Sequence, residues 1–93
     1  MELKILHVKD QNSYRSIWFN EEKVCDFSDG MMIEDVLHLM ADFVNQNCVE
    51  RVEVNTYNLW DVSTSDIPDC VKDEESFIKW HFERTGEAPE EGW

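Results

Sequence analysis

Acidic side chains at helical spacing are the groups in this chain whose type and position most clearly predict a chemistry. Glu34 or Asp35 and Asp42 are seven or eight residues apart, which is about 11 to 12 Å along a helix at about 1.5 Å per residue. That separation is close to three phosphate steps on one strand of duplex DNA, at about 3.4 Å each. A second group follows: Asp66, Asp69, Asp73, Glu74, Glu75 and Glu83. The two groups are predicted to place carboxylates in two rows, as a duplex places its phosphates.

The charge of the whole chain favours a shaped anionic surface. Its 93 residues include 21 acidic and 8 basic ones, a formal net charge of −13, yet 42% are hydrophobic and four are Trp. That apolar content predicts a folded chain whose surface charge is suited to a positive partner. Residues 24–50 hold six acids and no Lys or Arg, and residues 61–93 hold ten acids and three basic residues, a net of 3 − 10 = −7. Solvated helices ordinarily mix both signs, so this imbalance favours a binding surface over solubility alone.

Histidine and cysteine residues form no recognisable catalytic or metal-binding pattern. The histidines fall on three different predicted elements, without a second ligand at metal spacing: His7, His38 and His81. The cysteines are widely spaced and include no CxxC pair: Cys25, Cys48 and Cys70. A nucleophile, a base and an orienting group are not identifiable among these residues. We therefore expect neither an enzyme nor a bound metal or cofactor.

The remaining composition limits where the chain acts and what it binds. An odd number of widely spaced cysteines indicates a reducing compartment, and residues 1–5 lack the basic flank and apolar run of a signal peptide. No stretch approaches about 18 apolar residues, the length of a membrane-spanning helix. We expect a cytoplasmic protein without membrane contact. The negative charge also argues against direct binding to nucleic acid, which leaves basic protein surfaces as partners.

Apolar periodicity in the first half of the chain predicts three strands and a helix. Residues 3–8, 14–19 and 23–27 have the composition of strands separated by polar turns, typical of an antiparallel meander. The segment Ser28-Asp29-Gly30 then supplies a cap for a helix. In that helix apolar residues recur at helical spacing from Met32 to Val44. This helix is the clearest element in the chain, and its opposite face carries acids without basic residues.

The second half is predicted to add two strands and a second helix. Residues 49–56 alternate, with Val52 and Val54 on one side, and indicate a half-buried strand. A short fifth strand is predicted at residues 59–62. After a loop at residues 63–69, acids at Asp73-Glu74-Glu75 load the first turn of a second helix, where the helix dipole favours them. Gly86 is typical of the C-terminal cap of that helix.

The predicted order β-β-β-α-β-β-α indicates one α+β domain spanning residues 1–93. It has an antiparallel sheet of about five strands with two helices packed against it, and residues 87–93 form an acidic tail. Exposed strands at the edges of such a sheet are compatible with a homodimer across a two-fold axis. Eight aromatic residues are expected to form the core: Tyr14, Trp18, Phe19, Phe27, Trp60, Phe77, Trp80 and Phe82.

A small, very acidic α+β chain with carboxylates over its helices and loops resembles the DNA-mimic inhibitors of bacteriophages and mobile elements. That class includes anti-restriction proteins of the Arn type, uracil-glycosylase inhibitors and several anti-CRISPR proteins. The resemblance covers the whole chain through size, charge and layout, and no sequence motif carries it. It implies a non-enzymatic inhibitor that occupies the DNA-binding site of a basic host protein, such as a restriction nuclease, a repair enzyme or a nucleoid protein.

Three other interpretations remain open on the sequence. The acidic surface can serve solubility alone. An immunity or adaptor protein can use the acids to steer association and an aromatic cluster for affinity, with Trp60, Trp80 or Trp93 at the interface. A small hydrolase or metal protein is the third, and stoichiometric metal in purified protein would favour it.

Overall fold

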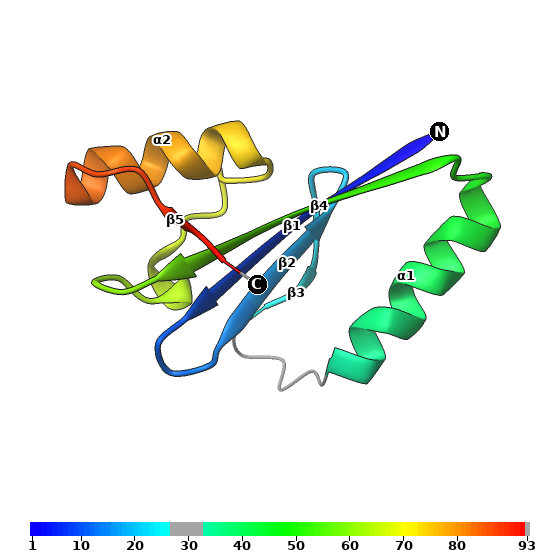
Figure 1. The fold of residues 1–93 in the computed structure, drawn as a ribbon, viewed down its shortest axis with the longest axis horizontal. Helices are drawn as coiled ribbons and strands as arrows, with labels where there is room; N and C mark the ends of the chain where they lie inside the picture. Colours follow the sequence, from blue (N-terminus) through cyan, green and yellow to red (C-terminus); the bar gives the residue numbers. More distant parts are fainter. Residues whose placement is uncertain (27–32, 93) are drawn as a thin grey trace.

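In the part of the chain that the structure describes, one five-stranded sheet is flanked by two α-helices (Figure 1). The computed structural model describes residues 1–26 and 33–92. The strands follow the order β3-β2-β1-β4-β5 across the sheet. In chain order the elements are β1 (Glu2–Asp10), β2 (Arg15–Phe19), β3 (Glu22–Cys25), α1 (Ile33–Asn47), β4 (Arg51–Leu59), the 3₁₀ helix η2 (Thr64–Asp66), α2 (Glu74–Thr85) and β5 (Glu90–Glu91). The predicted α+β fold class is confirmed.

The sheet is antiparallel as predicted except at one pair of strands. β4 runs parallel to β1, with Val52 beside Leu3 and Val54 beside Ile5. The helix between β3 and β4 accounts for this direction. Its 15 residues span about 22 Å at about 1.5 Å per residue, which returns the chain to the end of the sheet where β1 begins. A strand that follows such a crossover runs parallel to the one beside it.

Alternation along β1 creates two buried faces. Leu3 and Ile5 pack in one cluster with Val36 of α1, whereas Leu6 packs in another with Phe77 of α2. Because successive strand residues point to opposite faces, the two helices lie on opposite sides of the sheet, as Figure 1 shows. β1 is therefore buried from both sides and is the central strand of the fold.

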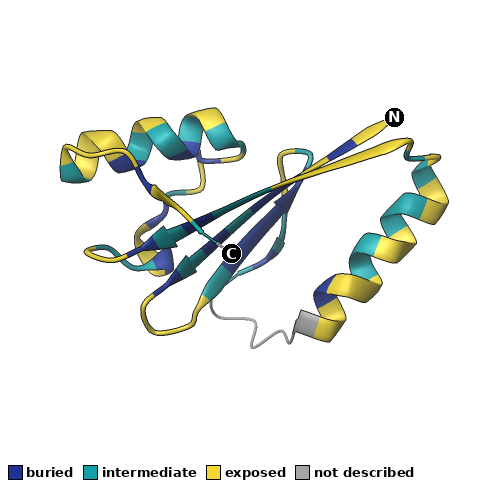
Figure 2. Cartoon of the chain, viewed as in Figure 1, coloured by how far each residue is buried: buried dark blue, intermediate teal, exposed yellow. Residues whose placement is uncertain are grey.

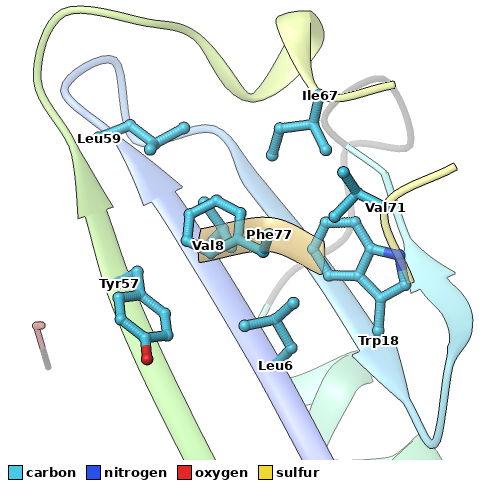
Figure 3. Close-up of a cluster of buried hydrophobic side chains, with 8 residues drawn as sticks. All are labelled: Leu6, Val8, Trp18, Tyr57, Leu59, Ile67, Val71 and Phe77. Atoms are coloured by element: carbon cyan, nitrogen blue, oxygen red, sulfur yellow. The ribbon is translucent and has the colours of Figure 1, made fainter. Parts of the chain in front are cut away.

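The core on the α2 side is closed. The ring of Phe77 is fully buried, and its centroid lies 5.2 Å from that of Tyr57 and 6.1 Å from that of Trp80. Figure 3 shows Phe77 and Tyr57 with the other buried side chains of this cluster, gathered over the sheet. The buried members of this cluster are Leu6, Val8, Trp18, Tyr57, Leu59, Ile67, Val71 and Phe77. Their packing fixes the position of α2 relative to the sheet.

The ends of α2 follow the prediction from sequence. Asp73 is the N-cap residue, so the acids predicted for the first turn lie at the start of the helix. Gly86 closes the other end with φ of 79°, a left-handed conformation that favours glycine, and its N–H donates to Phe82 O at 2.8 Å. Both predicted helix boundaries are confirmed.

Among the described residues, the core on the α1 side is less complete. Val36 is buried, but the other apolar residues that α1 packs against the sheet are half-buried, and Figure 2 shows exposed residues along much of this helix. The rings of Phe43 and Phe19 meet edge-on with centroids 5.9 Å apart. The predicted cap at Ser28–Gly30 lies outside the described residues. The described residues therefore hold α1 through partly buried contacts.

The apolar side of β4 is more open than the alternation in sequence implies. Val52 and Val54 lie on the α1 side of the sheet, beside the buried residues Leu3 and Ile5. Their exposures are nevertheless 44% and 56%. The apolar cover that α1 provides therefore ends at β1 and does not extend over the first half of β4.

The predicted fifth strand at residues 59–62 is wrong. β4 ends at Leu59, and the chain turns into η2, whose start is a capping box between Ser63 and Asp66. The carboxylate of Asp10 anchors this turn, because it accepts hydrogen bonds from the N–H of Thr64 at 3.1 Å and from its hydroxyl at 3.2 Å. The fifth strand is instead β5, which lies within the predicted acidic tail and pairs with the end of β4.

The aromatic residues divide between core and surface. Trp18, Phe19 and Phe77 are buried and Trp80 is half-buried, as expected of a core. Phe27 lies outside the described residues. The prediction is wrong for three others, which are more than half exposed: Tyr14, Trp60 and Phe82. In the described parts of the chain, neither helix has the length and apolar character needed to cross a membrane.

Candidate partner-binding surface

The two predicted rows of carboxylates lie on opposite sides of the sheet. Glu34, Asp35 and Asp42 are exposed on α1. The second row occupies η2, the loop after it, and α2 with its cap: Asp66, Asp69, Asp73, Glu74, Glu75 and Glu83. Because α1 and α2 cover opposite faces, the fold does not bring the two rows together on one surface (Figure 1). A partner that faces α2 meets the second row and not the first.

The acids at the start of α2 stabilise the helix and also carry negative charge. Asp73 Oδ1 accepts a hydrogen bond from the N–H of Ser76 at 2.8 Å, and Ser76 Oγ accepts one from the N–H of Asp73 at 3.1 Å. Hydrogen bonds from the hydroxyl and the N–H of Ser76 keep the pKa of Asp73 below its usual value. Glu74 and Glu75 follow in the first turn, where the helix dipole favours negative charge. The hydrogen bonds with Ser76 therefore fix the position of the Asp73 carboxylate at the N-terminal end of α2.

The other members of the second row are distributed along α2 and the loop before it. Asp66 Oδ2 accepts a hydrogen bond from the N–H of Ser63 at 3.1 Å and lies 4.0 Å from Nη2 of Arg84. Asp69 and Glu83 are exposed. Arg84 thus offsets part of the charge of Asp66, whereas Glu74 and Glu75 make the N-terminal end of α2 acidic.

A cleft of about 550 Å³ lies beside that end of α2. Leu6 and Trp18 of the sheet contribute to its lining. Five carboxylates and two ammonium groups also line it, a formal balance of 2 − 5 = −3: Glu21, Glu53, Asp73, Glu74, Glu75, Lys4 and Lys72. Carboxylates from a turn, a strand and a helix therefore converge on one cavity.

Glu21 and Glu53 are the cleft residues that sequence reasoning missed. Glu21 lies in the turn between β2 and β3, and Glu53 lies on β4, far along the chain from α2. A partial signal existed for Glu53, because it alternates with Val52 and Val54 and must point to the opposite face of the sheet. Its approach to α2 depended on that helix covering the same face, which the sequence did not specify.

Tyr57 connects the cleft acids to the core. It is buried in the cluster on the α2 side. Burial, the charge of Glu74, a hydrogen bond with Glu74 and the charge of Glu91 together raise the pKa of Tyr57 to about 12. The phenol is therefore protonated at neutral pH, and its hydroxyl can donate to the carboxylate of Glu74. This contact positions one cleft carboxylate against the sheet.

Few basic side chains offset the acidic surface. Among residues 1–26 and 33–92, two ion pairs form between side chains, Lys23 with Asp26 at 3.2 Å and Arg84 with Asp66 at 4.0 Å. Both pairs are partly exposed to solvent, where such contacts contribute little. In the described residues these two ion pairs therefore offset few of the acidic side chains.

The histidines and cysteines do not line this cleft. Across the part of the chain that the structure describes, no three His, Cys, Asp or Glu side chains are arranged to hold a metal ion. Burial and the charges of Arg15 and Lys9 lower the pKa of His7 to about 4, so its Nε2, 3.1 Å from Nη1 of Arg15, accepts a hydrogen bond. The three cysteines are free thiols, with Cys25 buried and Cys48 and Cys70 exposed.

The tryptophans of the aromatic-interface hypothesis have different surroundings. Trp60 is 52% exposed just after β4, and its Nε1 donates a hydrogen bond to Glu90 of β5. Trp80 packs against the core on the α2 side. Trp93 lies outside the described residues. Trp60 is therefore the Trp that the structure places at the surface.

Comparison of the chain with protein-family models, with curated proteins and with solved structures finds no match.

Proposed function

We propose that this protein is a non-enzymatic DNA-mimic inhibitor that binds a basic host protein and blocks its DNA-binding site. A restriction nuclease is the target class that we favour. The contact surface is the α2 side of the molecule, centred on the acidic cleft and extended by Asp69 and Glu83. The row of acids on α1 lies outside this contact, which revises the expectation of two rows acting together.

The cleft beside α2 is the observation that supports this proposal most directly. Three exposed carboxylates from separate parts of the fold line it: Glu21, Glu53 and Glu75. A concave site lined by one sign of charge focuses the electrostatic field and attracts ligands of the opposite sign. A DNA-binding groove is itself lined by Lys and Arg that bind closely spaced negative charges. The two surfaces are complementary in sign.

Affinity capture is the first test of this proposal. The immobilised protein is incubated with a bacterial lysate at low salt, and bound proteins are eluted with duplex DNA. We expect a DNA-binding protein whose affinity for this chain falls steeply as salt rises, because screening weakens contacts between charged surfaces. Recovery of no DNA-binding protein, or an affinity that is unchanged when salt rises several-fold, contradicts the proposal.

Two matched variants then test which side of the sheet makes the contact. The triple variant E21Q/E53Q/E75Q removes three charges from the cleft, and E34Q/D35N/D42N removes three from α1. We expect the cleft variant to bind the captured protein about tenfold more weakly, as the loss of about 1.4 kcal/mol implies, and the α1 variant to bind nearly as well as the wild type. Equal weakening by both variants would mean that net charge, and not the α2 surface, controls binding.

The exposure of Trp60 favours a second candidate function. An acidic immunity or adaptor protein would use the carboxylates to steer association and an exposed aromatic side chain for affinity. In that case Trp60→Ala weakens binding to the captured partner more than the cleft variant does. If Trp60→Ala is folded and binds normally while the cleft variant does not, the second candidate is excluded.

A further inference from the structure

The first half of β4 is a free edge of the sheet. β5 pairs only with Tyr57 and Asn58, and the N–H of Gly92 donates to Thr56 O at 2.8 Å. Along a strand, the backbone groups of every second residue point to the same side. The N–H and C=O groups of Val52 and Val54 therefore point outward, as Thr56 O does, and within residues 1–26 and 33–92 no strand lies beside them.

One face of this edge is apolar. Val52 and Val54 project to the α1 side and are about half exposed, and Figure 2 shows exposure along the first half of β4. Where β5 ends, a notch of about 160 Å³ continues along the strand beside Val54. Sheet edges are normally protected by charge, proline or a covering segment, because an open edge pairs with other strands. Among the described residues, neither a proline nor a covering strand protects Val52 and Val54.

The other face of the same edge borders the acidic cleft. Glu53 and Asn55 point to the α2 side and line the cleft together with the acids of α2. A strand added beside β4 would place alternate side chains on the two faces. One set would lie against Val52 and Val54, and the other would reach the cleft carboxylates. A strand paired with this edge would therefore make backbone hydrogen bonds, apolar contacts and charged contacts at the same time.

We propose that the free edge of β4, residues 51–55, binds an extended segment of the basic partner in which apolar and basic residues alternate. Main-chain hydrogen bonds to Val52 and Val54 supply affinity, and the alternating side chains supply specificity. The inference rests on the proposed function, because the cleft acids select a basic segment. A second copy of this chain fits less well, since each copy carries a charge of −13 and like charges repel.

Synthetic peptides test the pattern directly. The probe is a peptide of strictly alternating Val and Arg, and its control has the same residues in two blocks. Calorimetry at low salt measures affinity, and amide hydrogen exchange followed by NMR locates the contact. We expect the alternating peptide to bind more tightly and to slow exchange at Val52 and Val54. The amides of β3, at the opposite edge of the sheet, should not change.

A proline substitution tests the role of the edge. Val54→Pro removes an outward N–H that makes no hydrogen bond to β1, and proline is tolerated in edge strands at such positions. Val54→Thr keeps the N–H and serves as the matched control. We expect Val54→Pro to weaken binding of the alternating peptide about tenfold, since it removes a hydrogen bond and blocks close approach of a strand. Val54→Thr should weaken it less. If Val54→Pro does not fold, the exchange measurement on the wild type decides.

The possible outcomes separate this inference from the proposed function. Equal affinity for the two peptides, or unchanged exchange at Val52 and Val54, overturns the edge as the docking site. If salt-sensitive capture of a DNA-binding protein persists in that case, the proposed function stands. If the alternating peptide binds the edge but no DNA-binding protein is captured, the proposed function fails alone. A concentration-dependent dimer that Val54→Pro abolishes would assign the edge to a second copy and overturn the inference.

Discussion

The two sides of the sheet differ in how firmly their helices are held. On the α2 side, Phe77 is fully buried and Asp73 caps the helix. On the α1 side, Phe43 is half-buried, and Val52 and Val54 remain open beside the helix. Both helices carry exposed acids, and on the α2 side acids from the sheet and from the helix line one cleft. Carboxylates form a defined site on the side of the sheet where a closed core fixes the positions of the elements that carry them.

The difference between the two sides of the sheet also explains why the acidic cleft and the free edge both include β4. α2 covers the C-terminal half of β4 through Tyr57 and Leu59, whereas residues 51–54 of its N-terminal half are exposed. That half contributes Glu53 to the acidic cleft and Val54 to the open apolar edge. This exposed strand segment therefore carries both proposed contacts.

Truncation of an aromatic ring on each side should give the largest difference. Phe77→Ala is expected to lower the free energy of unfolding by about 3 to 5 kcal/mol, because it leaves a cavity in a closed core. Phe43→Ala should cost clearly less, because the ring is half-buried and its site can collapse or hydrate. Urea unfolding followed by circular dichroism measures both values. Equal losses would mean that α1 is packed as firmly as α2.

Removal of the charge of Asp10 should have the next largest effect. Asp10 is 4% exposed, and burial alone would raise its pKa. The net effect is a lowered pKa, because the Asp10 carboxylate accepts hydrogen bonds from the N–H groups of Thr64, Tyr14 and Asn12 and from the Ser63 hydroxyl. Asp10→Asn should lower the free energy of unfolding by about 2 kcal/mol, the usual contribution of hydrogen bonds to a charged group.

The pH dependence of the Asp10→Asn effect provides its control. A carboxylate with a lowered pKa stabilises the folded state above the pKa that it has in the unfolded chain, near 3.8, and this contribution is lost as pH falls through the lower folded value. The difference in stability between wild type and Asp10→Asn should therefore narrow below about pH 3.8. A difference that stays constant down to strongly acidic pH contradicts the role of the Asp10 charge.

Loss of the N-cap of α2 should have a smaller effect on stability than loss of the Asp10 charge. Asp73→Ala is expected to cost about 1 kcal/mol, the typical value for an N-cap residue. Glu34→Gln, which also removes one acid from the first turn of a helix, should cost less because Glu34 is not the cap residue of α1. Thermal unfolding of both variants measures the difference. A larger loss of stability for Glu34→Gln than for Asp73→Ala would contradict this prediction.

Residues of the candidate site could be predicted from sequence where their position depends only on neighbouring residues in the chain. Asp73, Glu74 and Glu75 were identified from sequence because a cap and an acidic first turn are properties of adjacent residues. Glu21 and Glu53 were missed because they reach the cleft through the pairing of strands and the placement of α2. The capping box between Ser63 and Asp66 was also readable locally, and it would have argued against a strand at residues 59–62.

The sequence by itself determined the α+β class, both helices, four of the five strands and the surplus of negative charge. Periodicity, caps and turn residues act over a few neighbours, so they can be read along the chain. Only the tertiary structure decided that α1 and α2 cover opposite faces, that β4 runs parallel to β1 and that β5 closes part of its edge. These features depend on which faces bury the most apolar surface together, and that is settled between segments distant in sequence. The same packing separated the two rows of acids and left the first half of β4 open.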